Sequence, residues 1–237
     1  MPKVLRIGQI LISAEKDVYV PGEDTFFLED AIRDLSEEFL IQTRSALEIG
    51  TGSGYISVVL WQILPKSAKI IASDITDQSI NSTRRTLELN GVFNNVSVLK
   101  SDLFNEIVLR AKKNKNGIRE SKIDLIVFNP PYLPDSTKEN PLDALEHAWS
   151  GRNETGDEII LKFFQQVRDW GNALLSNDCK IIIVLSSYNT MARQWLRENT
   201  NILKTLLTKE RRSSILGESL CVVVAEYKSS KSSQKDT

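Results

Sequence analysis

The stretch DLIVFNPPYLP, residues 124–134, ends an apolar run in an asparagine, two prolines and a tyrosine. The side-chain oxygen of Asn129 and the backbone carbonyl of Pro130 can both accept hydrogen bonds from one planar NH2 group. Pro130 and Pro131 have no N–H and hold φ fixed, so these acceptors are aimed in advance. The ring of Tyr132 can lie along a flat amide or base. A substrate with a planar NH2 group is therefore expected to bind this NPPY motif, which comprises Asn129, Pro130, Pro131 and Tyr132.

The chemistry that suits such a motif is methyl transfer to nitrogen. An amide nitrogen is a poor nucleophile because its lone pair is delocalised into the carbonyl. Two acceptors on its hydrogens return electron density to the nitrogen and orient it toward a methyl donor at about 3–3.5 Å. Asn129, Pro130 and Tyr132 are therefore the predicted catalytic residues. The alternative is a proline-rich strand exit without chemistry.

A second motif, LEIGTGSGYIS, places Gly50, Gly52 and Gly54 between a predicted strand and a predicted helix. Glycines at such positions let the backbone turn sharply and approach a ligand without a Cβ clash. The glycine pattern alone is weak evidence for any one cofactor, since it also suits a dinucleotide or a tight turn without a ligand. The choice of cofactor therefore depends on the neighbouring residues.

Three carboxylates at the ends of three successive predicted strands narrow that choice. Glu48 precedes the glycine turn, where it could receive an ammonium group or hold loop amides but would repel a pyrophosphate. Asp74 can accept hydrogen bonds from both hydroxyls of a ribose. Asp102 can accept from the exocyclic amine of adenine, while Leu103 or Phe104 packs on the ring. Any one acid could be a plain strand-end cap, but the ordered set suits a cationic, phosphate-free adenosine compound, and S-adenosylmethionine has that character.

The hydrophobic pattern predicts a scaffold that brings these strand ends together. Apolar runs alternate with amphipathic stretches, and several runs are apolar at successive positions, as in strands covered on both faces. This alternation predicts an α/β fold with a doubly wound parallel sheet, right-handed crossovers and ligand sites beyond the carboxyl ends of the strands. The predicted strands are 45–50, 68–74, 96–102, 122–129, 179–186, 219–227 and a shorter one at 204–212. The predicted helices are 24–40, 55–64, 77–91, 158–175 and 189–200, the third with Asp77 as its N-cap and Gly91 at its C-terminal end.

Length and composition limit the class of protein. With 237 residues, 41% of them hydrophobic, the chain fits one domain over residues 1–228, with an N-terminal arm (1–23) and a disordered tail (229–237). Its net charge of -1 gives no general attraction to nucleic acid or to a membrane. No apolar run is long enough to span a membrane and no signal peptide is visible, so we expect a cytoplasmic protein.

Several other features are expected to be structural. Cys179 and Cys221 lie far apart in predicted strands and are expected to be buried, while the basic stretch 110–122 is expected to be a solvated loop. His147 is the only histidine and is expected to be solvated or to cap a helix. No histidine, cysteine or carboxylate cluster has the spacing of metal ligands, so no metal site is predicted.

From about Tyr19 to Tyr227 the chain resembles the class I S-adenosylmethionine-dependent methyltransferases. The NPPY motif resembles motif IV of those members that act on glutamine amides or on adenine or cytosine amines. The segment VYVPGEDTFFLEDAI (18–32) resembles the N-terminal signature of the HemK family of protein glutamine methyltransferases, in its eukaryotic and archaeal branch. HAWSG followed by GDEII also matches that branch, although Arg152 stands where the family usually has a second glycine. The resemblance implies that the mouth of the cofactor and acceptor site is lined by Tyr19, Pro21, Glu23, Asp24 and Thr25.

The resemblance implies a Rossmann-like fold with a mostly parallel seven-stranded sheet and helices on both faces. It implies methyl transfer from S-adenosylmethionine to the glutamine of the GGQ motif in a class 1 translation termination factor. It also implies that Thr25 and Asn129 contribute to the cofactor pocket. The alternatives are adenine-N6 methylation of RNA or DNA, methylation of a protein lysine, and a non-catalytic scaffold. The near-neutral charge disfavours the first of these, although the basic stretch 110–122 leaves it open, and the intact NPPY motif disfavours the last.

The resemblance further implies a partner protein. In this family the third strand lies at the edge of the sheet, where relatives bind a small zinc-binding activator protein, and an exposed edge is a template for pairing. In the sequence NNVSVLKSD, Val96 and Val98 alternate with Ser97 and Leu99, so both faces of the strand carry an apolar residue. We expect the activator at this edge, Val96–Leu99. The alternatives are that the chain's own arm or a second copy covers it.

Overall fold

In the computed structural model of the chain, residues 2–113, 122–134, 155–213 and 219–229 are described. These residues form a seven-stranded sheet with the order β5-β4-β3-β6-β7-β9-β8. All neighbouring strands are parallel except that β9 runs antiparallel to both β7 and β8. The predicted doubly wound, mostly parallel fold is therefore confirmed. The strands are β3 (Ser45–Ile49), β4 (Lys69–Asp74), β5 (Val96–Lys100), β6 (Ile123–Phe128), β7 (Leu175–Ser186), β8 (Leu203–Arg212) and β9 (Ser219–Tyr227).

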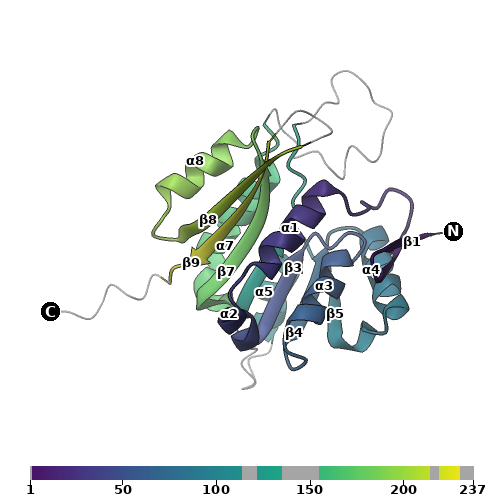
Figure 1. The fold of residues 1–237 in the computed structure, drawn as a ribbon. Coiled ribbons are helices and arrows are strands. Elements are labelled where there is room, and N and C mark those ends of the chain that lie inside the picture. The colour runs from purple at the N-terminus through teal and green to yellow at the C-terminus, as the bar shows by residue number, and fades with distance from the viewer. Residues whose placement is uncertain (1, 114–121, 135–154, 214–218, 230–237) are drawn as a thin grey trace.

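Helices cover both faces of the sheet, with α1 and α3 on one face and α5 and α7 on the other (Figure 1). Strands β3 and β6 are buried at every position, so both of their faces are covered and their sequences do not alternate. The helices are α1 (Glu23–Arg33), α2 (Glu37–Gln42), α3 (Tyr55–Ile63), α4 (Asp77–Leu89), α5 (Asn105–Lys113), α7 (Glu158–Leu174) and α8 (Thr190–Glu198), with a short 3-10 helix, η1 (Phe93–Asn95).

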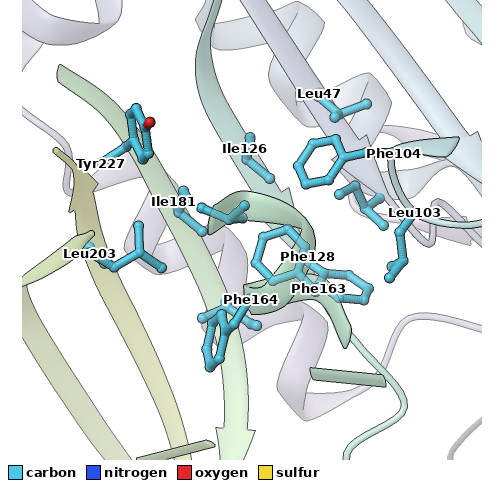
Figure 2. Packing of buried hydrophobic residues seen from close by; sticks show 14 of the residues in the cluster. Leu47, Leu103, Phe104, Ile126, Phe128, Phe163, Phe164, Ile181, Leu203 and Tyr227 are labelled. Atoms are coloured by element: carbon cyan, nitrogen blue, oxygen red, sulfur yellow. The ribbon is translucent and has the colours of Figure 1, made fainter. Parts of the chain in front are cut away.

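The two faces bury separate hydrophobic cores. In the core under α5 and α7, Phe163 packs edge-on against Phe128 at 5.2 Å between ring centroids and stacks on Phe104 at 5.7 Å (Figure 2). Full burial of one such side chain stabilises a fold by about 1.5–3 kcal/mol. Because Phe128 is the last residue of β6, this core fixes the strand end from which the NPPY motif departs.

The N-terminal arm is a β-hairpin of β1 (Lys3–Ile7) and β2 (Ile10–Ala14), which the sequence pattern did not predict. Strand β2 lies against α4, where the amide of Ser13 donates to Thr86 Oγ1 at 2.9 Å and that of Leu11 to Asn90 Oδ1 at 3.1 Å. The arm therefore packs on a helix and does not cover β5, which pairs only with β4 among the described residues.

Two predicted helices differ in detail from the structure. The stretch 24–40 is not one helix: α1 ends at Arg33, and Ser36 starts α2 by accepting from the amide of Phe39 at 3.3 Å. A serine hydroxyl competes with the helical backbone for hydrogen bonds, so it favours a new start. The N-cap of α4 is Thr76 and not Asp77, whereas Gly91 follows the helix with φ +70° as predicted.

The basic stretch predicted as a loop begins as helix, because residues 110–113 belong to α5. Ile107 and Val108 of that helix are buried in the core, and this tertiary contact supports a helix that its polar sequence did not indicate. Residues 114–121, His147, Arg152 and the tail from 230 lie outside the described residues. Both cysteines are buried, as predicted. Among the described helices, none is long and apolar enough to cross a bilayer.

Candidate active site

A cavity of about 590 Å³ lies beyond the carboxyl ends of β3, β4, β5 and β6. Strand β3 is where the chain reverses direction across the sheet, since β4 and β5 lie on one side of it and β6 and β7 on the other. Such a switch point leaves a crevice between neighbouring loops. The predicted residues that line the cavity are Tyr19, Pro21, Glu23, Asp24, Thr25, Glu48, Gly50, Gly52, Asp74, Asp102, Leu103, Asn129, Pro130, Pro131 and Tyr132.

The glycine loop joins β3 to α3 through three left-handed residues, with φ +68° at Gly50, +52° at Gly52 and +82° at Gly54. Residues with a Cβ rarely adopt these values, so the loop needs glycine. Gly54 does not line the cavity; a Cβ there would lie 3.0 Å from Thr83 Cα, so this glycine lets α3 start close to α4. Gly50 and Gly52 form the part of the loop that can approach a ligand.

Glu48 lies at the buried floor of the cavity, where it holds the glycine loop. Its Oε2 accepts from the hydroxyl of Thr51 at 2.9 Å and from that of Ser57, so it ties the glycine loop to the first turn of α3. Burial raises the pKa of this carboxyl from 4.5 to about 8, although the two hydroxyls oppose the shift. Its contact with a cofactor ammonium stays a prediction.

Asp74 ends β4 and connects three parts of the cavity wall. Its Oδ2 accepts from the amide of Gly52 at 3.1 Å, and its Oδ1 accepts from the amide and hydroxyl of Thr76 at 3.0 and 3.1 Å. These bonds hold the carboxylate at the rim of the cavity. In this position it can also accept hydrogen bonds from vicinal hydroxyls of a ligand.

Asp102 follows β5 and is paired by a lysine that the sequence analysis missed. Its Oδ2 accepts from Lys162 Nζ of α7 at 2.5 Å, and both residues line the cavity. The next residue, Leu103, also lines the cavity and has φ +50°, a strained value for a residue with a Cβ. Phe104 instead points into the core (Figure 2), so of the two candidates for packing on a ligand ring only Leu103 is in place.

The carboxamide of Asn129 is held by a carboxylate from another part of the chain. Asn129 Nδ2 donates to Asp24 Oδ2 of α1 at 2.9 Å, and the hydroxyl of Tyr132 donates to the same oxygen at 3.2 Å. The opposite atom of the carboxamide, Oδ1, is buried and has no hydrogen-bond partner among the described residues. A buried acceptor without a donor costs about 1–3 kcal/mol, so this atom can take a donor that the described residues do not supply.

The backbone of the NPPY motif is held from the other side by the segment around α7 and α8. Asn189, just before α8, is buried and donates from Nδ2 to the carbonyl of Tyr132 at 2.9 Å. Asp157 in turn accepts from the amides of Met191 and Ala192, which start that helix. Gly156 has φ +70°, and a Cβ there would lie 2.2 Å from the carbonyl oxygen of Tyr132.

Among the charged side chains that line the cavity, six are acidic and one is basic. Lys162, already paired with Asp102, is the one basic residue among the described residues that line it. Such a site favours a cationic ligand and disfavours a polyanion. Its combined features can hold a cationic nucleoside compound beside the glycine loop and a planar NH2 group beside Asn129. The acidic side chains are Asp17, Glu23, Asp24, Glu48, Asp74 and Asp102.

Sequence reasoning found the strand-end residues but missed the residues that hold them. Lys162 and Asn189 sit in segments where only helix patterns were visible, and Asp157 lies in GDEII, which was noted only as a family match; no local signal links the three to the NPPY motif. Asp24 was expected at the mouth only by resemblance. Its contact with Asn129 spans 105 residues of sequence.

Comparisons with known proteins agree with the geometry. A family model described as the methyltransferase small domain matches residues 29–146. The methyltransferase HEMK2 of Mus musculus is 34% identical over 66% of this chain and 68% of its own. A release factor glutamine methyltransferase of Bacteroides thetaiotaomicron is 29% identical over 67% of this chain and 51% of its own. The E. cuniculi Mtq2 in a Mtq2-Trm112 complex, described as responsible for methylation of the eRF1 translation termination factor, is 25% identical, with a TM-score of 0.57 over 90% of this chain and 99% of that one.

Proposed function

Since this chain belongs to the HemK family of S-adenosylmethionine-dependent methyltransferases, we propose that it methylates the side-chain amide nitrogen of the glutamine in the GGQ motif of a class 1 translation termination factor. The observation that carries the proposal is the buried oxygen of Asn129, which has no donor among the described residues. A glutamine NH2 group is a donor of matching shape.

On the acceptor side, the roles follow from hydrogen-bond geometry. Asn129 Oδ1 accepts from one N–H of the glutamine amide and the Pro130 carbonyl from the other. Both bonds hold the nitrogen lone pair toward the methyl donor. The bound amide has therefore already lost the rotational freedom that a free amide would have to lose on reaching the transition state. The ring of Tyr132, tied through its hydroxyl to Asp24, packs along the flat face of the amide.

On the cofactor side, S-adenosylmethionine when bound supplies an electrophilic methyl group on a positively charged sulfur. The backbone of Gly50 and Gly52 approaches its methionine part, and Asp74 accepts from the ribose hydroxyls. Asp102 accepts from the adenine amine while Leu103 packs on the ring. Two observations support this fit: Gly50 and Gly52 line the cavity in left-handed conformations, and six acidic residues in its lining suit a cation.

The same acidic lining argues against methylation of adenine in RNA or DNA. A base-flipping enzyme must hold the phosphate backbone at the mouth of its pocket, usually with lysine and arginine. The described lining includes Asp17, Glu23 and Asp24, and its one lysine, Lys162, is already paired with Asp102. A neutral glutamine in a protein loop meets no such repulsion.

We also propose that a small zinc-binding activator protein pairs with β5; the similar E. cuniculi Mtq2 structure is that of a complex with Trm112. Strand β5 is a sheet edge whose outer side has no partner among the described residues. Leu99 packs into one core and Val96 into the other, so the strand is fixed while Ser97 stays exposed. A termination factor substrate places this pair of proteins in the cytoplasm.

The proposal is tested with labelled S-adenosylmethionine and the enzyme prepared with and without its co-expressed activator. We expect label on a GGQ-containing termination factor and none on the same factor with the glutamine replaced by alanine. Mass spectrometry should place about 14 Da on that glutamine, as expected for one methyl group by its chemical composition. Label on RNA or DNA, or on a lysine of the factor, would replace the proposal with the corresponding alternative.

A further inference from the structure

Asp24 is a buried carboxylate in the first turn of α1 on which several hydrogen-bond donors converge. Its Oδ1 accepts from the hydroxyl of Tyr19 at 2.5 Å and from the amide of Thr25 at 2.6 Å. Its Oδ2 accepts from Asn129 Nδ2 at 2.9 Å and from the hydroxyl of Tyr132 at 3.2 Å. One carboxylate thus joins the N-terminal segment to both polar side chains of the NPPY motif.

The chemical character of this group decides which way the Asn129 carboxamide faces. An ionised carboxylate only accepts, whereas a carboxamide has a donor end and an acceptor end. If the carboxamide turned over, Asn129 Oδ1 would face Asp24 Oδ2 and two negative oxygens would meet in a buried site. Asp24 therefore imposes the orientation in which Nδ2 faces its carboxylate. Oδ1 lies at the opposite end and has no hydrogen-bond partner among the described residues.

Asp24 is itself fixed by its neighbours. Burial, followed by the negative charge of Asp24, raises the pKa of Tyr19, so this hydroxyl keeps its proton and remains a donor. The N-terminus of α1 places partial positive charge beside the carboxylate. These contacts leave the carboxylate little freedom to rotate away from Asn129.

We infer that Asp24 is the positioning residue that sets the orientation of the Asn129 carboxamide and so makes the site select an acceptor group that donates hydrogen bonds. This inference rests on the proposed function, since it names how the glutamine NH2 group is chosen. The bond to Asp24 also strengthens the acceptor at the other end of the carboxamide, because hydrogen bonds in a chain polarise one another. Asp24 acts through Asn129 and need not touch the substrate.

The test compares Asp24→Asn with Asp30→Asn, a matched loss of charge on the exposed side of the same helix. An asparagine at position 24 can donate as well as accept, so it no longer imposes one orientation. We expect kcat on a GGQ-containing factor to fall on the order of 100-fold, as when one oriented polar group is lost from an active site. The Kd for S-adenosylmethionine should stay within about threefold, and Asp30→Asn should match the wild type.

A double-substitution cycle separates positioning from a general structural role. If Asp24 acts through Asn129, then Asp24→Asn should add little to the loss already caused by Asn129→Ala. Losses that multiply in the double variant, or a kcat for Asp24→Asn equal to that of Asp30→Asn, would overturn the inference while the proposed function stands.

A readout without turnover decides the question even if Asp24→Asn does not fold or the wild type does not methylate glutamine. In the complex with S-adenosylhomocysteine, the 15N-labelled side-chain amide of Asn129 is assigned by its loss in Asn129→Ala. We expect its protons to be shifted downfield and protected from exchange by the bond to Asp24. Signals typical of a solvent-exposed amide would overturn the inference. Failure of the wild type to label glutamine would count against the proposed function alone.

Discussion

The half of the cavity that we propose for the cofactor and the half that we propose for the acceptor are built in different ways. In the half proposed for the cofactor, Glu48 and Asp74 bind Thr51 and Gly52 of the glycine loop, whereas Asp102 is held by Lys162 of α7, 60 residues away. In the acceptor half, Asn129 and Tyr132 are held by Asp24 and Asn189, which lie 105 and 57 residues away from their respective partners.

The difference shows how the two tasks constrain a chain. A nucleoside cofactor is recognised mainly by backbone shape and strand-end acids, which a short motif can carry. Orientation of a small planar amide needs side chains fixed on several sides, and only packing of distant segments provides that. Substitutions should therefore separate the two halves: some should affect cofactor affinity, and others turnover at saturating cofactor.

The largest effect is expected for Asn129→Ala. Loss of the acceptor that orients the substrate nitrogen should lower kcat by roughly 1,000-fold or more, with cofactor affinity within about threefold of the wild type. Turnover and calorimetric cofactor binding provide the two measurements, and Asn81→Ala on the exposed face of α4 is the matched control. A parallel fall in cofactor affinity would show that the halves are not separable at this residue.

The opposite pattern is expected for Asp74→Asn. Hydrogen bonds to a charged acceptor contribute about 1.5–3 kcal/mol, so the Kd for S-adenosylmethionine should rise on the order of 10- to 100-fold. At saturating cofactor, kcat should recover most of its wild-type value. Asp77→Asn, which removes an exposed carboxylate paired with Lys100, should leave cofactor binding unchanged. Unchanged cofactor affinity in Asp74→Asn would remove this acid from the cofactor half.

Two glycines with the same φ test whether the contact between Gly156 and the NPPY backbone positions the proposed acceptor half. In Gly156→Ala the new Cβ would overlap the carbonyl of Tyr132, so the free energy of unfolding should fall by roughly 2–4 kcal/mol and kcat should fall as the NPPY backbone moves. Gly91 has the same φ of +70°, but a Cβ there would meet no atom within 4 Å, so Gly91→Ala should lose only about 1 kcal/mol and keep full activity. Equal activity of the two variants in the same assay would show that the contact at Gly156 does not position the motif.

The last effect concerns the pH dependence of stability and involves Glu48 in the proposed cofactor half. Its pKa is raised from 4.5 to about 8 in the folded protein, so the native state holds the proton that the unfolded chain releases. Its contribution to stability is therefore full below pH 4.5 and is lost as pH rises to about 8. Glutamine does not titrate, so Glu48→Gln does not lose this stability. The melting temperature of the variant minus that of the wild type should therefore increase as the pH is raised from about 5 to about 9. A difference that does not change with pH would contradict the raised pKa.

The sequence alone determined the α/β alternation, the seven strands of the sheet and the residues at their carboxyl ends. These follow from local chemistry, because apolar runs form buried strands and glycines and prolines specify turns wherever they occur. Asn129 could be identified because two prolines directly after a buried strand are unusual unless a rigid turn is needed there.

Only the tertiary structure decided which way the Asn129 carboxamide faces, that Lys162 pairs with Asp102, and that Gly54 serves the start of α3. The hairpin of the N-terminal arm and the helix α5 also depend on contacts with α4 and with the core. In each case the stabilising partner lies far away in sequence. The free energy that fixes the element comes from packing and long-range hydrogen bonds, which local patterns do not contain.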